Sequence, residues 1–169
     1  GRWVDGPGQA LFRAISEALG PLPIIAEDLG VITPDVDALR RAFDFPGMRI
    51  LQFAFGDTNG NAYLPHNFEP DTVVYTGTHD NDTTAGWYQA APEQERDHVR
   101  RYLRVDGKDV AWDFVRASYA SASRLAVITL PDVLSLGSAA RFNTPSNAEG
   151  NWQWRYRAAA LEKFFDGTT

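Results

Sequence analysis

The sequence predicts an α/β protein with parallel strands, and three observations support that fold class. Short apolar runs bounded by glycine and proline alternate with amphipathic segments of helical period, as in strand–helix–strand units. Two of the apolar runs end directly in carboxylates, the first at Glu27 and Asp28 and the second at Asp80 and Asp82. Strands that alternate with helices pair in parallel through right-handed crossovers. We therefore expect these acids at one edge of a sheet, where parallel α/β folds usually site their chemistry.

The expected helices have recognisable start and stop signals. Leu11, Ile15 and Leu19 recur at helical spacing before a glycine–proline stop,. Thr33 is a suitable cap for a second helix, with Pro34 at its first position. The expected helices span Gln9–Leu19, Pro34 to Phe43, Thr83–Ala90, Pro92–Leu103, Val110–Ser121 and Tyr156–Phe165.

Four apolar runs are interpreted as buried strands because they are short and bounded by turn residues. A closed eight-stranded barrel typically needs about 250 residues, so the residues leave open a small doubly wound sheet or part of a barrel. Residues 138–155, which are polar and aromatic, predict an irregular loop near the site. The expected strands are Leu22–Ala26, Met48–Phe55, Thr72–Thr76 and Leu125–Leu130.

Composition excludes several classes of function. Of the 169 residues, 44% are hydrophobic and 22% are charged, which is typical of a globular protein,. The net charge of −6 argues against a nucleic-acid or anionic-membrane partner,. There is no cysteine, and we find neither a bilayer-spanning run nor a signal-peptide core,. We expect a cytoplasmic protein. Five tryptophans suit stacking on sugar faces, although packing in a core is the alternative,.

Six blocks of residues carry a resemblance to a known family. In chain order they resemble segments of the 4-α-glucanotransferases (amylomaltases, glycoside hydrolase family 77), almost from end to end. The resemblance implies the fifth to eighth strands of a (β/α)₈ barrel, with residues 1–169 as a single C-terminal portion of it. The blocks are Gly6-Pro7-Gly8 with Leu11-Phe12, Ile24–Thr33, Pro46–Phe55, Tyr63–Asn67, Gly77–Thr83, and Arg141–Pro145 with Glu149–Trp152.

The resemblance also implies a reaction and roles for three residues. The family transfers α-1,4-glucan segments between maltodextrins, or to glucose, with retention. By position Glu27 resembles the general acid/base, Asp80 the carboxylate that stabilises the transition state, and His79 a sugar-hydroxyl ligand. The nucleophilic aspartate belongs upstream of Gly6, so we expect these 169 residues alone to be inactive and the activity to belong to the complete enzyme.

The chemistry of the residues agrees with these roles but leaves alternatives. Retaining transfer needs a carboxyl group that is first an acid and then a base, with a second carboxyl group about 5–5.5 Å away. Glu27 fits the first role, although it could instead cap the next loop. Asp80 could instead close an Asx-turn. The donors of residues 79–82 could hold a metal, but adjacent side chains point in different directions, so we expect no metal and no cofactor.

Further residues are candidates for binding a maltodextrin or starch-type glucan. The polar ones could bind sugar hydroxyls or could tie loops together, and Trp152 could stack on a sugar or pack. Two local departures from the family, Pro131-Asp132 and Pro145-Ser146, put individual subsite contacts in doubt. The expected substrate-binding residues are His79, Asp28, Arg49, Asn67, Asn81 and Trp152.

Two other functions remain open from the sequence. One is an α-glucan hydrolase of the α-amylase superfamily, and the other is a non-catalytic glucan-binding or structural fragment. A half-barrel would expose the edges of its first and fourth strands, which is an aggregation liability. We therefore expect either the N-terminal half of the same enzyme or a second copy of the chain to cover them.

Overall fold

The sheet has three short parallel strands in the order β1, β2, β3. The computed structural model describes residues 1–2, 4–56 and 61–167. Strand β1 spans Gly47–Ile50, β2 spans Thr72–Tyr75 and β3 spans Leu125–Val127. Parallel pairing along the whole sheet confirms the predicted α/β class with parallel strands.

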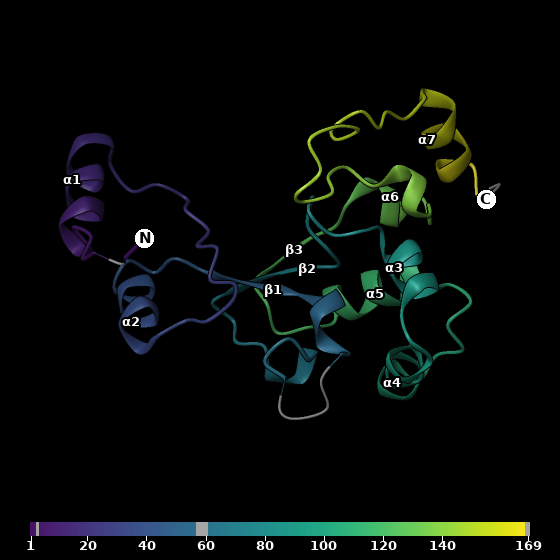
Figure 1. Cartoon of the computed structure of the whole chain (residues 1–169), viewed down its shortest axis with the longest axis horizontal. Helices are drawn as coiled ribbons and strands as arrows, with labels where there is room; N and C mark the ends of the chain where they lie inside the picture. The colour runs from purple at the N-terminus through teal and green to yellow at the C-terminus, as the bar shows by residue number, and fades with distance from the viewer. Residues whose placement is uncertain (3, 57–60, 168–169) are drawn as a thin grey trace.

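The helices follow the sequence signals closely. Thr33 precedes the second helix with Pro34 in its first turn, and the Thr83 hydroxyl accepts a bond from the Gly86 amide at the start of the third. In Figure 1, α1 and α2 lie to one side of the sheet and α3 to α6 to the other. The helices are α1 (Gln9–Leu19), α2 (Pro34–Ala42), α3 (Thr84–Ala90), α4 (Glu93–Leu103), α5 (Val110–Tyr119), α6 (Leu130–Val133) and α7 (Ala158–Phe165), with 3₁₀ turns at Leu51–Ala54, Pro65–Asn67 and Ser138–Ala140.

The strand register sorts side chains onto two faces. Ile50 pairs with Tyr75, and Tyr75 pairs with Val127, so these three side chains form a row on one face. Successive residues of a strand point to opposite faces. Arg49 and its partner Val74 therefore belong to the other face. This alternation decides which strand residues can reach the candidate site.

The hydrophobic core lies where the 3₁₀ turn after β1 packs against α4 and α5. Leu51, Phe55, Val99 and Phe114 are almost fully buried there. The rings of Phe55 and Phe114 are 5.4 Å apart at a tilted angle, which is a favourable arrangement of aromatic pairs,. The core therefore supports the end of β1, next to the carboxyl edge of the sheet.

One predicted strand, Leu22–Ala26, is wrong. The segment is irregular in the described structure and does not join the sheet. Pro21 and Pro23 have no N–H to donate to a ladder. The Ala26 amide does bond to the Pro46 carbonyl at 2.9 Å, but further along the Met48 amide donates to the Asp28 carboxylate at 2.6 Å. A side chain thus takes a place at the edge of β1 that a strand partner's carbonyl would occupy.

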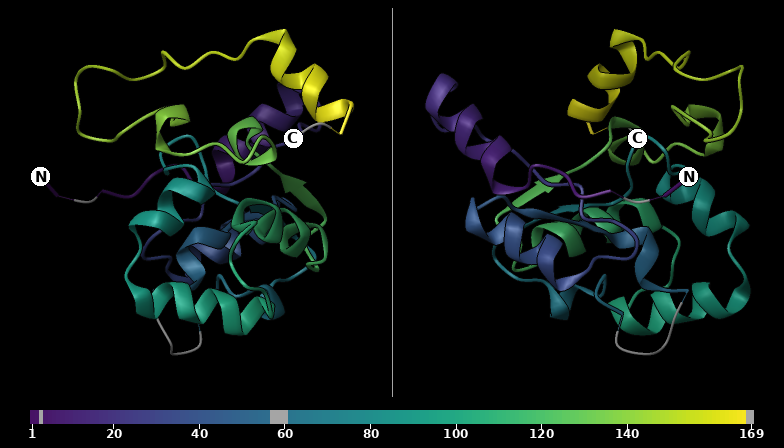
Figure 2. Two further views of the ribbon diagram at one scale, coloured as in Figure 1. Left: turned by 90° about the vertical axis from the view of Figure 1, so that its right-hand side faces the viewer. Right: turned by 60° about the vertical axis from the view of Figure 1, so that its left-hand side comes forward.

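Two other predicted strands are shorter than expected. Residues 51–54, predicted as strand, form a 3₁₀ turn instead, and this turn places Leu51 and Ala54 together in the hydrophobic core. The last strand ends at Val127, and Leu130 already begins α6, with Pro131 in the first turn of that helix. Residues 141–157 contain no helix or strand, and Figure 2 shows them as a long arc from the last 3₁₀ turn to α7. Among the described helices, none is long and apolar enough to cross a membrane.

Candidate active site

A cavity of about 480 Å³ lies at the carboxyl ends of the three strands. The row formed by Ile50, Tyr75 and Val127 is part of its wall. Both predicted catalytic carboxylates, Glu27 and Asp80, also line it. The remaining lining residues are Leu29, Met48, Phe53, Gly77, Thr78, His79, Asn81 and Thr129.

Glu27 reaches the cavity from the irregular segment beside β1. It is exposed, so its carboxyl group is open to a ligand entering the cavity. Burial raises the pKa of the Tyr75 phenol, and the negative charge of Glu27 raises that pKa further. Glu27 and Tyr75 line the same cavity, so Glu27 lies near the end of β2 on the cavity side of the sheet.

The loop that carries Asp80 is held by its own side chains. The Asn81 amide oxygen accepts bonds from the Thr78 amide and from the Thr78 hydroxyl, both at 2.9 Å. Buried Gln52 donates to the Asp82 carbonyl at 2.9 Å. A Cβ atom on Gly77 would lie 2.6 Å from Gln52 Nε2, so a larger residue here would force the Gln52 amide or the loop to shift.

Asp132, for which the sequence predicted no function, holds both ends of this loop through hydrogen bonds. It is 1% exposed and lies in α6. Its oxygens accept bonds from the Thr76 hydroxyl at 2.5 Å, from the Thr84 amide at 2.7 Å and from the Thr84 hydroxyl at 3.0 Å. Asp132 thereby connects the end of β2 with the start of α3. In the sequence Asp132 follows an apolar run and belongs to a local departure from the family, but no role was predicted for it.

Asp80 itself is held by residues from the long arc. Its Oδ1 accepts a bond from Asn143 Nδ2 at 2.5 Å and lies 3.3 Å from His79 Nε2. Its backbone carbonyl accepts a bond from Arg141 Nη2 at 2.7 Å. The Asp80 side chain remains 49% exposed, so the carboxylate is oriented but still accessible. Arg141 and Asn143 belong to a block noted in the sequence, but no role was predicted for them.

Trp152 lies beside His79 outside the main cavity. The two rings are 5.3 Å apart, and Trp152 is 57% exposed. Its backbone has a φ of 61°, which is unusual for a bulky residue, and its amide donates to the Phe142 carbonyl at 2.6 Å,. A second cavity of about 420 Å³ shares His79 with the first and is lined by Trp152, Phe142, Trp154, Arg155 and Tyr156.

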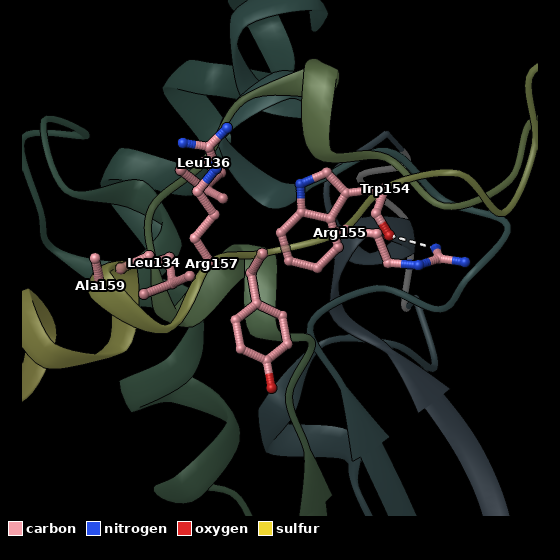
Figure 3. Close-up of a pocket in the computed structure, with 8 residues that line it drawn as sticks. Leu134, Leu136, Trp154, Arg155, Arg157 and Ala159 are labelled. Atoms are coloured by element: carbon pink, nitrogen blue, oxygen red, sulfur yellow. Dashed lines mark hydrogen bonds between the residues drawn. The ribbon is translucent and has the colours of Figure 1, made fainter.

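A third cavity, of about 440 Å³, continues past Trp154 toward α7. Figure 3 shows the Trp154 ring in it, with Leu134 and Ala159 on the far side. The Arg155 guanidinium donates to the Trp154 carbonyl at 2.7 Å, which is the dashed line of that view. An apolar and aromatic surface therefore begins at His79 and extends away from the main cavity.

Besides Trp152, three other predicted substrate-binding residues do not line the main cavity. Arg49 is on the opposite face of β1, and its guanidinium donates to the Met48 carbonyl at 2.7 Å. The Asp28 carboxylate binds the Met48 amide and lies 3.7 Å from Arg40 and 3.6 Å from Arg49. Asn67, in the second 3₁₀ turn, donates to the Asn61 carbonyl at 3.0 Å. His79 and Asn81 do line the cavity. The sugar-binding roles of all these residues stay predictions.

The donors of residues 79–82 do not assemble into a metal site in the described structure. Across the described ranges, no group of three or more histidine, aspartate or glutamate side chains is arranged to hold an ion. The polar side chains that line the cavity offer two carboxyl groups, an imidazole, an amide, a phenol and two hydroxyls.

A cavity lined by carboxylates at the carboxyl edge of a parallel sheet is typical of α/β enzymes, whose active sites lie at this edge. A comparison with known protein families identifies the family to which the chain belongs. The family glycoside hydrolase 77, described as 4-alpha-glucanotransferase, matches residues 1–161, and the chain belongs to it. The resemblance read from the six blocks is confirmed.

Comparisons with curated relatives and with solved structures lead to the same family. The chain is 48% identical over 170 residues to the 4-alpha-glucanotransferase of Synechocystis, covering 99% of this chain and 34% of the relative. It is 50% identical over 156 residues to a chloroplastic/amyloplastic 4-alpha-glucanotransferase of Arabidopsis thaliana, covering 92% and 27%. An amylomaltase from Streptococcus agalactiae in complex with acarbose aligns at a TM-score of 0.89 and 38% identity, over 95% of this chain and 33% of that one. The chain thus spans about a third of the length of these proteins.

Proposed function

We propose that this chain is the part of a retaining 4-α-glucanotransferase that carries the general acid/base. The enzyme would transfer α-1,4-glucan segments between maltodextrins or to glucose. One observation supports the proposal most strongly: Glu27 and Asp80 line the same cavity in a chain that belongs to glycoside hydrolase family 77. The solved neighbour in complex with acarbose also supports a glucan-like ligand.

In the proposed mechanism the two carboxyl groups have different tasks. Glu27 donates its proton to the glycosidic oxygen as the bond to the anomeric carbon breaks, and an aspartate outside these 169 residues attacks that carbon. Glu27 then removes the proton from the acceptor hydroxyl, which attacks the anomeric carbon and releases the aspartate. The Asp80 carboxylate stabilises the positive charge that develops on the sugar ring in both steps.

We further propose that β1, β2 and β3 are strands of a (β/α)₈ barrel completed by the N-terminal remainder of the enzyme. The alignment with a third of the amylomaltase chain supports this reading. So do exposed apolar side chains at both open edges: Ile25 is 40% exposed beside β1, and Leu125 is 48% exposed on β3. A cytoplasmic location stays a prediction.

The first test is an intact mass of the purified polypeptide, followed by incubation of the same sample with maltotriose. A mass above 18.8 kDa, with glucose and longer maltodextrins as products, is the expected result. Reducing sugar without longer products would identify a hydrolase instead. The 169-residue chain produced alone is expected to be inactive, since removing a nucleophile costs several orders of magnitude in rate.

Variants of the active polypeptide then test the assigned roles. Glu27→Gln keeps the shape of the side chain but cannot move a proton, so kcat should fall by about 10²–10⁴-fold. Glu17→Gln, the same change at an exposed position of α1, should leave kcat unaltered. Asp80→Asn should also lower kcat by about 10²-fold or more, because it removes the stabilising charge. Transfer that persists at the wild-type rate in Glu27→Gln would contradict the proposal.

A further inference from the structure

We propose that Arg141 and Asn143 are positioning residues that hold Asp80 in the orientation its reaction requires. The inference rests on the proposed function of Asp80 and extends it to two residues with no predicted role. Both lie in the arc after the last 3₁₀ turn, 61 and 63 residues along the chain from Asp80. Neither lines the main cavity, and both contact Asp80 directly.

Arg141 fixes the backbone of the Asp80 loop. Its Nη2 donates to the Asp80 carbonyl at 2.7 Å, and its Nε donates to the Asn143 carbonyl at 2.8 Å. The guanidinium is planar and rigid, so two bonds from different edges set the spacing between the loop and the arc. A lysine has a single ammonium on a flexible stem and cannot hold both carbonyls in this geometry.

Asn143 fixes the carboxylate of Asp80. Its Nδ2 donates to Oδ1 at 2.5 Å, on the same oxygen that lies 3.3 Å from His79. Within the described residues no side chain donates to Oδ2 of Asp80. This second oxygen therefore remains available to the sugar. A half-exposed aspartate would otherwise exchange among staggered rotamers. Held by Asn143, its charge is preorganised toward the place where positive charge develops.

The kinetic test uses the active full-length polypeptide and maltotriose. Asn143→Ala should lower kcat by on the order of 10²-fold, because a displacement of about 1 Å costs that much, while KM should change by less than about threefold. Asn147→Ala is the matched control. Asn147 is exposed in the same arc, and the bond it accepts from Asn151 ends on its backbone oxygen.

A double-mutant cycle separates positioning from direct contact with substrate. In an Asp80→Ala background, Asn143→Ala should change the residual rate by less than about twofold, because its target is already gone. An undiminished effect in that background would overturn the proposal. So would a variant with a raised KM and an unchanged kcat, since this would indicate that Asn143 binds substrate itself.

Arg141 is tested by a pair of substitutions. Arg141→Met removes both bonds, whereas Arg141→Lys keeps one donor, so kcat should be lowest in the methionine variant and partly recovered in the lysine variant. The lysine variant also keeps the test decisive if the methionine variant fails to fold, as judged by circular dichroism. Equal kcat values in Arg141→Lys and wild type would refute the positioning role of Arg141.

A structural readout decides the proposal independently of activity. Crystal structures of the wild type, Asn143→Ala and Asn147→Ala should show the Asp80 carboxylate displaced or split between two conformers only in Asn143→Ala. An unmoved carboxylate in that variant would overturn the proposal even if kcat falls. If the wild type fails to transfer glucan, the proposed function fails, and the crystallographic comparison still decides whether Asn143 positions Asp80.

Discussion

Replacing Asp132 by alanine removes the buried carboxylate that fastens both ends of the Asp80 loop. Three bonds are lost, from the Thr76 hydroxyl and from the Thr84 amide and hydroxyl. A hydrogen bond to a charged group contributes about 1.5–3 kcal/mol. The variant loses three such bonds, but it also no longer buries a charge, which offsets part of the loss. The free energy of unfolding should therefore fall by about 3–5 kcal/mol.

Asparagine at the same position provides an internal calibration. Its amide oxygen can keep the bond from the Thr84 amide, and its NH₂ group meets two hydroxyl oxygens that can rotate and accept,. The remaining loss is the extra strength of bonds to a charged acceptor, so Asp132→Asn should cost about 1–2 kcal/mol. The exposed Asp5→Ala should lie within about 0.5 kcal/mol of the wild type,.

The assay is urea unfolding of the full-length polypeptide at neutral pH, with the midpoint compared at constant slope. The expected order of stability is wild type and Asp5→Ala, then Asp132→Asn, then Asp132→Ala. The reasoning is refuted if Asp132→Ala costs less than about 1 kcal/mol, or if the asparagine variant is as unstable as the alanine variant. Either result would mean that the three bonds do not hold the loop.

Two further predictions concern close packing and acid stability. A Cβ atom on Gly86 would overlap the Ser138 hydroxyl and lie 2.9 Å from the Ser138 backbone nitrogen. Gly86→Ala should therefore lower the free energy of unfolding by about 1–3 kcal/mol, measured by thermal unfolding. The control is Gly137→Ala, where no atom lies within 4 Å of the added Cβ, and it should change the free energy of unfolding by less than about 0.5 kcal/mol,. Burial opposes the ionisation of Asp71, yet the hydrogen bond and charge of Arg40 outweigh burial and hold the Asp71 pKa below its ordinary value. A carboxyl group with a depressed pKa stabilises the fold above about pH 4, and this stabilisation is lost as the pH falls through the folded pKa. Asp71→Asn should therefore reduce the loss of unfolding free energy in acid. Because solvent screens this partly exposed pair, the reduction should be less than about 1 kcal/mol,. Equal melting temperatures for Gly86→Ala and Gly137→Ala would contradict the first prediction. An unchanged dependence of stability on pH in Asp71→Asn would contradict the second.

Local sequence determined the helices and the position of the candidate catalytic acids. Helical periodicity, Thr33 with Pro34, and Thr83 are short-range signals, and the six predicted helices begin within two residues of their expected starts, whereas α6 was not predicted. Glu27 and Asp80 follow apolar runs, and the carboxyl ends of parallel elements meet at one edge, which is why both line one cavity,. Glu27 reaches the cavity although the run before it is not a strand. The reason is that the Ala26 amide donates to the Pro46 carbonyl, which keeps the segment next to β1.

Only the tertiary structure decided what each polar residue contacts. The strand register turns Arg49 away from the cavity, and the Asp28 carboxylate replaces a backbone partner at Met48. Asp132 satisfies donors about fifty residues away, and Asn143 reaches Asp80 across 63 residues. Periodicity and capping are properties of neighbouring residues in the chain. A hydrogen bond between distant segments depends on how the whole sheet and its loops pack, and no local pattern encodes that distance.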